Sequence, residues 1–180
     1  MASQQPSCDD PRRDDQAAPS AAAPTLVVPE DAPRADRLRA VAFAYREWGV
    51  THPHRFGLLY GDPIPGYAAP PGGVTVEAMR RVGEALGAPV IDAYVHGRLR
   101  PVEPPGPLAG RLAAGMPEFG GHAIPPSLSA LLLLLWGRLH GQVSLEVFGH
   151  HAWLFPDGCA ELYELEVERI IDDLRIRDRA

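Results

Sequence analysis

Histidine is the residue type in this sequence that is best suited to chemistry, because its side chain can bind a metal ion or transfer a proton near neutral pH. The candidates in the second half of the chain are His122, His140, His150 and His151, with Asp157 and Cys159 nearby. Their spacing does not favour a metal site, because the adjacent His150 and His151 diverge on a helix and no HExxH pattern occurs. The sequence also lacks a GxSxG turn and a phosphate-binding glycine loop. We therefore predict that the protein is not an enzyme and has no catalytic residue, metal or cofactor. The alternative is a histidine-based metal-dependent enzyme.

Trp136 and His140 lie one helical turn apart at the end of the most apolar stretch of the chain, directly after five consecutive leucines. A polar side chain inside a protein needs a hydrogen-bond partner, whereas one that lines a cavity can contact a ligand. The pair therefore has two interpretations, a core tryptophan beside a hydrogen-bonded core histidine, or part of the wall of a ligand pocket. The residues alone leave both interpretations open.

The stretch around this pair, residues 127–151, is predicted to form one long buried helix. Apolar residues recur at spacings of three and four on one face, which contains Leu128, Leu132, Trp136, Leu139, Val143 and Val147, while Leu134, Leu145 and Phe148 line a second face. The helix must therefore be covered on more than one side. Gly137 and Gly141 each cost about 1 kcal/mol of stability relative to alanine inside a helix. Their spacing of four residues therefore predicts a flat strip on the helix where another backbone comes close.

The apolar run is too short to cross a membrane, because Arg138 and Gln142 interrupt it well before the roughly 20 residues that a bilayer requires. The N-terminus has no apolar segment of the kind that secretion signals contain. Cys8 and Cys159 provide neither a disulfide framework nor a CxxC metal site, which fits a reducing compartment. We therefore predict a cytoplasmic protein without membrane contact.

The remaining apolar patterns are helical as well. We expect a first core helix over residues 34–50, a short helix over 53–60 and a longer one over 75–99, in which Pro89 produces either a kink or two stacked helices. A weak helix over 107–116 and a last helix that begins near Gly158 complete the series. No segment alternates convincingly as a strand, so the predicted fold is an all-α helical bundle.

Two stretches lack any periodic apolar pattern. Residues 1–33 contain six prolines, six acidic residues and two arginines, so we predict a disordered tail ahead of one domain over residues 34–180. The proline- and glycine-rich residues 61–75 form a loop of the length expected for a lid over a site. The rest of the chain, with 17 acidic residues and 15 arginines, presents no basic face for nucleic acid.

Two stretches together, residues 45–61 (YREWGVTHPHRFGLLYG) and residues 135–150 (LWGRLHGQVSLEVFGH), resemble the C-terminal regulatory domain of TetR-type transcriptional repressors. The WHG type is the most similar subgroup, since Trp136, His140 and Gly141 match the residues for which it is named. The order of helices from about Arg34 to Arg175 also fits. The resemblance implies a helical bundle that binds a small, often apolar ligand and forms a homodimer through its last two long helices.

The resemblance also implies where these sites lie. A cavity between the helices at 53–60, 75–99 and 127–150 would be lined by Phe56, Leu59, Tyr60, Met79, Val82, Leu86, Tyr94, Trp136 and His140. We expect this cavity to be mostly apolar and bounded by Phe56, Met79, Tyr94 and Trp136, with His140 as one polar contact. The dimer interface would contain Leu145, Phe148, Leu162, Leu165, Val167, Ile170 and Leu174, because this strip is too large for one neighbouring helix to cover.

The sequence departs from the family at its N-terminus. A helix-turn-helix DNA reader needs on the order of 40 residues, and the proline-rich, acidic residues 1–33 show no such pattern. We therefore expect contact with DNA only through a helix-turn-helix that this chain does not contain, because either the reading frame starts late or the protein is a free-standing sensor. A further alternative is a dimeric interaction protein that pairs with full-length TetR-type repressors.

Overall fold

The described part of the chain is a bundle of six helices with one small hairpin. The structure is a computed structural model, and it describes residues 31–61 and 73–174. The helices are α1 (Arg34–Thr51), α2 (Pro53–Tyr60), α3 (Val74–Val95), α4 (Gly106–Gly115), α5 (Pro126–Val147) and α6 (Ala160–Leu174). The predicted all-α fold class is confirmed. The predictions for a tail and for most of the loop at 61–75 lie outside the described residues.

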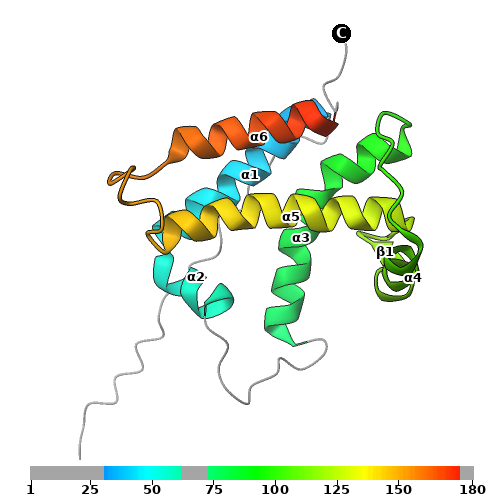
Figure 1. The fold of residues 1–180 in the computed structure, drawn as a ribbon, viewed down its shortest axis with the longest axis horizontal. Helices are drawn as coiled ribbons and strands as arrows, with labels where there is room; N and C mark the ends of the chain where they lie inside the picture. The colour runs from blue at the N-terminus through cyan, green and yellow to red at the C-terminus, as the bar shows by residue number, and fades with distance from the viewer. Residues whose placement is uncertain (1–30, 62–72, 175–180) are drawn as a thin grey trace, which may run out of the picture.

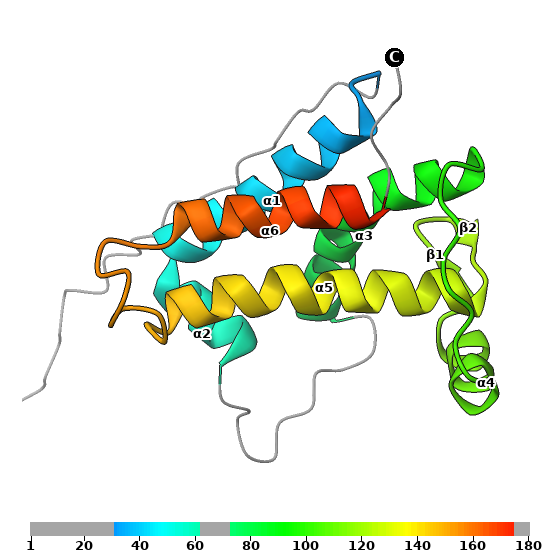
Figure 2. The ribbon, with the colours of Figure 1, turned by 45° about the horizontal axis from the view of Figure 1, so that its top comes forward.

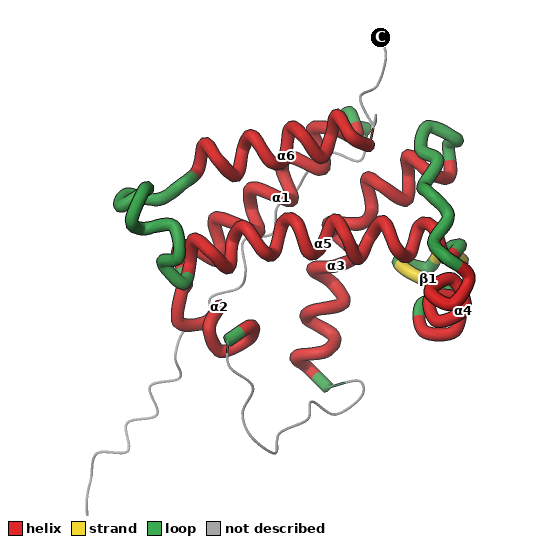
Figure 3. The backbone as a smooth tube through the Cα atoms, in the orientation of Figure 1, coloured by secondary structure: helices red, strands yellow, loops and turns green. Residues whose placement is uncertain are grey.

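Helix α5 is the centre of the fold. In Figure 1 it runs across the molecule, with α1 and α6 on one side of it and α3 crossing behind it. Figures 2 and 3 show α1, α5 and α6 side by side, and these three helices contact one another pairwise. Leu128, Leu139 and Val143 are fully buried, as the helical period of this segment predicts. The helix ends at Val147, earlier than the predicted residue 151.

Helix α5 is also, among the described helices, the one that is long and apolar enough to cross a membrane by length and composition. The core helix of a soluble protein passes the same test. Here α5 contributes buried side chains to the bundle at seven positions, and Arg138 forms an ion pair of 2.6 Å with Glu166 of α6. The central place of α5 in the bundle therefore explains its buried apolar residues, although Leu133 and Leu134 are exposed.

Helix α3 continues through Pro89 as one helix, which decides between the two alternatives that the sequence leaves open. Proline has no amide hydrogen to donate and its ring crowds the preceding turn, so a helix bends where it contains one. Figure 1 shows the two parts of α3 running in different directions on either side of α5. Val90 and Ile91, which follow the proline, are buried, and the helix ends at Val95 rather than near residue 99.

The last helix, α6, buries one face in the same core. Its residues Tyr163, Val167, Ile170, Ile171 and Leu174 are each at most 7% exposed, and the Tyr163 hydroxyl donates a hydrogen bond of 3.0 Å to the Ala42 carbonyl of α1. The expectation that Val167, Ile170 and Leu174 need a second chain to cover them must be corrected, because α1 and α5 cover them within one chain. Leu165 of the same predicted strip is 56% exposed.

The sequence does not predict the small antiparallel hairpin that precedes α5. Its strands are β1 (Glu118–Phe119) and β2 (His122–Ala123), joined by Gly120 and Gly121 with φ angles of 57° and 77°. Positive φ at both central residues is the geometry that suits a two-residue hairpin turn and favours glycine. Strands of two residues are too short to show an alternating pattern, although a glycine pair is itself a hairpin signal.

Candidate functional site

Aromatic side chains fill the space where α1, α2 and α5 meet. The cluster consists of Tyr45, Trp48, Phe56, Tyr60, Trp136, His140 and Phe148. The rings of Trp136 and His140 are stacked, with centroids 4.9 Å apart and planes 6° apart. Tyr60 lies on His140 as well, with a centroid distance of 4.5 Å. The one-turn spacing of Trp136 and His140 therefore places a polar ring at the centre of an aromatic cluster.

Both ring nitrogens of His140 have partners within the chain. The Tyr45 hydroxyl lies 2.7 Å from Nδ1, and the Ser144 hydroxyl lies 3.3 Å from Nε2. A neutral imidazole has one donor and one acceptor nitrogen, and a hydroxyl can take either role, so both contacts can be satisfied at once. Burial lowers the pKa of His140, and burial raises the pKa of both Tyr45 and Tyr60. The centre of the cluster is therefore uncharged at neutral pH.

A small apolar cavity of about 110 Å³ lies beside the cluster, between α3, α5 and the hairpin. Its lining residues are Gly83, Leu86, Gly87, Met116, Phe119, Leu132, Leu133, Leu135 and Trp136. None of these side chains carries a charge, so the cavity favours hydrocarbon groups. Leu86 and Trp136 are the two predicted ligand-binding residues that line it.

The other predicted ligand-binding residues lie around this cavity rather than in its wall. Phe56 is completely buried in the core, Tyr60 packs on His140, and Leu59 faces solvent on α2. Met79, Val82 and Tyr94 are half-buried along α3. A larger cavity bounded by Phe56, Met79 and Tyr94 stays a prediction. The hairpin residue Phe119 and the glycines of α3 are not in the sequence-based set, because the sequence does not predict the hairpin and a glycine has no side chain to contact a ligand.

A second, open cleft of about 920 Å³ separates the start of α1 from α3 and the hairpin. Its wall is half polar and half apolar, and its three acidic residues and three arginines compensate one another in charge. Asp92 of α3 lies 2.7 Å from Arg34, 3.4 Å from Arg37 and 2.9 Å from His96. The cleft therefore does not present an excess of one charge to an ionic ligand.

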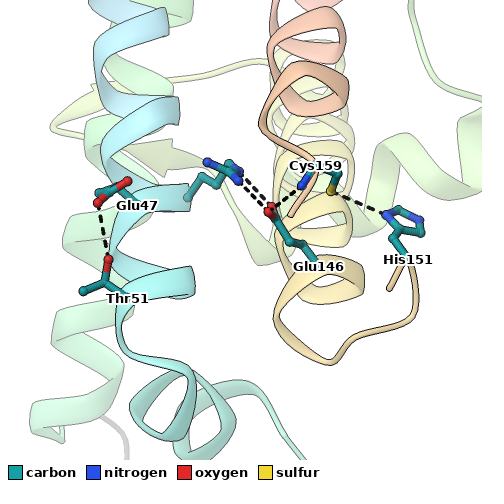
Figure 4. Close-up of polar contacts among 6 residues, drawn as sticks. Glu47, Thr51, Glu146, His151 and Cys159 are labelled. Carbon is teal, nitrogen blue, oxygen red and sulfur yellow. Dashed lines mark hydrogen bonds and ion pairs between the residues drawn. The ribbon is translucent and has the colours of Figure 1, made fainter. Parts of the chain in front are cut away.

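Glu146 near the end of α5 joins three elements, as Figure 4 shows. Its carboxylate accepts hydrogen bonds from Arg46 of α1 at 2.8 and 2.5 Å, and from the backbone amide of Cys159, just before α6, at 3.0 Å. Burial opposes the charged form of Glu146, but the Arg46 bonds outweigh burial and the pKa of Glu146 is lowered. Arg46 and Glu146 thereby position the start of α6 against α1 and α5.

The histidines do not form a metal or nucleophile site in the described residues. The imidazole of His151 lies 3.7 Å from the Cys159 sulfur, as Figure 4 shows, but burial and the nearby Glu146 carboxylate raise the pKa of that thiol. A raised pKa disfavours the thiolate that acts as nucleophile. His122 and His150 are exposed, and the part of the chain that the structure describes contains no group of three or more residues able to hold a metal ion.

An exposed apolar strip, hereafter the α5 strip, runs along the side of α5 that faces away from the core. It consists of Leu134, Gly137, Gly141 and Leu145, and it ends at the half-exposed Phe148, whose ring also contacts Phe56 of α2. Leu134 is 67% exposed, and a Cβ atom added at either glycine would meet nothing within 4 Å. Leu165 of α6 is exposed too. The flat strip predicted from the two glycines therefore exists, but within the described chain no other element comes close to either glycine.

Residues 38–170 match the family model for the tetracyclin repressor-like C-terminal domain. The chain belongs to this family. The resemblance that the sequence carries at residues 45–61 and 135–150 is thus confirmed at the level of the TetR C-terminal domain. Membership places the chain among domains of transcriptional regulators rather than in an enzyme family. It also implies a protein that works inside the cell.

The relatives that match are transcriptional regulators. The chain is 37% identical over 119 residues to HTH-type transcriptional regulator Rv1816 of Mycobacterium tuberculosis and to HTH-type transcriptional regulator Mb1846 of Mycobacterium bovis. In both cases the match covers 64% of this chain and 50% of the relative. The chain therefore spans about half the length of the curated relatives that it matches.

Proposed function

We propose that this TetR-type domain senses a small, uncharged, apolar molecule and forms a homodimer. The observation that carries the sensing role is the apolar cavity between α3 and α5, whose wall includes Trp136. The bundle around that cavity is the TetR C-terminal domain. A charged ligand does not suit the site, because its walls carry no charge and His140, beside it, is held neutral. The predicted set from Phe56 to His140 marks the region in which a larger ligand extends.

Dimerisation is proposed to use the α5 strip together with Leu165 of α6. A strip of exposed leucine, glycine and phenylalanine on one side of a helix is typical of a surface that binds another protein surface. The glycines allow a second helix to approach closely, since nothing occupies the space above them. The same strip also suits the alternative in which the chain pairs with a full-length repressor, and only capture of that partner distinguishes the two.

Reading of operator DNA is proposed to belong to a helix-turn-helix outside the described residues. The relatives are named HTH-type transcriptional regulators, and the match covers half of each of them. In this proposal the described domain changes the activity of the reader through ligand binding and does not contact DNA. Titration of labelled promoter DNA tests this point, and specific binding by residues 31–174 at about 0.15 M salt would overturn it.

The sensing proposal is tested by thermal unfolding with matched neutral and charged compounds. Benzyl alcohol and longer neutral analogues are expected to raise the melting temperature, since a ligand at 100 times its Kd adds about 2.7 kcal/mol of stability. Benzoate is not expected to do so, because the cavity wall carries no charge to pair with its carboxylate. Trp136→Phe is expected to weaken this shift by changing the cavity wall. If no neutral apolar compound shifts the wild-type protein, the sensing proposal fails.

His140→Ala separates the two interpretations of the Trp136 and His140 pair. Removal of a buried hydrogen-bond partner costs about 1–3 kcal/mol, because the Tyr45 hydroxyl loses its 2.7 Å contact with the imidazole. If the variant loses that much stability but keeps its ligand shifts, His140 is a core residue. If the ligand shifts disappear while the protein without ligand stays stable, His140 contacts the ligand.

A further inference from the structure

The ring of Phe119 is seated on two glycines of α3. A Cβ atom at Gly87 would lie 2.7 Å from Cε1 of this ring, and one at Gly83 would lie 3.5 Å from its Cζ. Each glycine costs about 1 kcal/mol relative to alanine inside a helix, so a pair spaced by four residues has a packing explanation at this position. Gly87 provides the space, because even an alanine there would overlap the ring. The backbone of α3 thus forms the floor of a slot that accepts one aromatic ring.

This slot is continuous with the apolar cavity. Phe119, Gly83 and Gly87 are themselves lining residues of the 110 Å³ space, which extends from them to Leu132 and Trp136. An apolar cavity of about 150 Å³ stays dry and binds benzene in a well-studied engineered case, so this space is somewhat too small for a ring while Phe119 occupies the slot. Removal of the Phe119 ring would enlarge it further. The chain therefore places its own aromatic ring where a ring-sized ligand would lie.

The hairpin that carries Phe119 is fixed at its base and not at its tip. At the base, Ile124 is buried and donates its amide to the Pro117 carbonyl at 3.0 Å, and the buried Ser129 hydroxyl donates to the Met116 carbonyl at 3.1 Å. Of residues 118–123, all except Phe119 are exposed. Because few buried contacts mark the parts of a protein that open most easily, the position of the tip against α3 depends mainly on the Phe119 ring.

We propose that Phe119 is a resident plug in the ligand site, and that a neutral molecule with an aromatic ring or a short hydrocarbon chain displaces it from the slot over Gly87. This inference rests on the proposed sensing function and specifies how the site opens. Displacement frees the tip of the hairpin, which leads through Ile124 and Pro125 directly into α5. Ligand binding is thereby coupled to the first turn of the central helix.

Benzene binding to Phe119→Ala tests the plug by affinity. Removal of the ring abolishes the competition for the slot, so we expect benzene to bind at least about tenfold more tightly than it binds the wild type, a change of about 1.4 kcal/mol. Phe119→Leu, which keeps an apolar plug, is expected to fall between the two. Phe155→Ala is the control, because Phe155 lies in the loop before α6 and does not line the cavity. Equal or weaker binding by Phe119→Ala would overturn the proposal.

The two glycines provide a matched pair for a structural test. Gly87→Ala is expected to expel the Phe119 ring, whereas Gly83→Ala makes the same chemical change in the same helix at an ordinary contact distance. A nuclear Overhauser contact between the Phe119 ring and residue 87 shows whether the ring lies in the slot. We expect it to persist in Gly83→Ala, and to disappear in Gly87→Ala and in the wild type saturated with benzene.

The two proposals fail in different ways. Wild-type protein that binds benzene while the Phe119 contact to Gly87 persists would overturn the plug and leave the sensing function standing. If neither the wild type nor Phe119→Ala binds benzene, the cavity is not a ligand site and the plug is overturned, while the panel of longer neutral compounds still decides the sensing function.

Discussion

His140 has surroundings that favour its neutral form, which makes the stability of the domain depend on pH. Burial lowers the pKa of this imidazole below its usual value of about 6.5. The unfolded chain then binds the proton more readily than the folded one, so the stability that the neutral ring contributes is present above about pH 6.5 and is lost as the pH falls through the folded pKa. We expect the free energy of unfolding to decrease between about pH 7 and pH 5, and His140→Gln to reduce that decrease.

Urea unfolding at a series of pH values measures this dependence. His54→Gln is the matched control, because His54 is exposed on α2 and lies outside the aromatic cluster. If His140→Gln and His54→Gln show the same pH dependence as the wild type, the surroundings of His140 do not determine its protonation. The shift in Glu146 acts at lower pH, since its pKa lies below 4.5, and therefore does not interfere in this range.

At the scale of elements, the contact between α5 and the start of α6 depends on Glu146. Its side chain and that of Arg46 are 9% and 13% exposed, so their ion pair is largely shielded from water. Glu146→Gln leaves the arginine without its counter-charge, and we expect a loss of roughly 2–4 kcal/mol, slightly below the range for a fully buried pair. Chemical unfolding measures the loss.

Glu47→Gln is the control for that substitution. Glu47 lies on α1 next to Arg46 and contacts Thr51 at the surface, as Figure 4 shows. Its replacement is expected to leave stability nearly unchanged, because exposed polar pairs contribute little. A loss of stability that is equal in the two variants would show that Glu146 does not hold α6 in place.

The sequence predicts the helices well and the site less well, for a physical reason. The period of 3.6 residues is a local property, so α1, α2, α4 and α5 are found near their predicted positions. The same period shows that one face of α6 is buried, but it cannot show whether its own chain or a second chain covers that face. The cavity is harder still to predict from the sequence. Its wall combines α3 and α5 with Phe119, which comes from a hairpin whose strands are too short to show a sequence pattern.

At the scale of the whole molecule, the two proposed binding sites lie on different faces of α5. One face carries the buried leucines, Trp136 and His140, and the other carries the α5 strip. A ligand beside Trp136 and a partner on the strip would therefore contact the same rigid helix on two neighbouring faces. Such an arrangement allows the two binding events to influence each other, because both act on the position of one element.

The dimer is tested by placing a charge on the α5 strip. In the proposed dimer Leu134 becomes buried against the partner, so Leu134→Glu would bury an unpaired carboxylate and oppose association. We expect the wild-type domain to be a dimer at micromolar concentration and Leu134→Glu to be a folded monomer, as measured by light scattering and circular dichroism. Leu58→Glu is the control, because Leu58 is 84% exposed and lies on α2 rather than on α5. A wild-type monomer, or equal dissociation by both variants, would remove the strip from the interface.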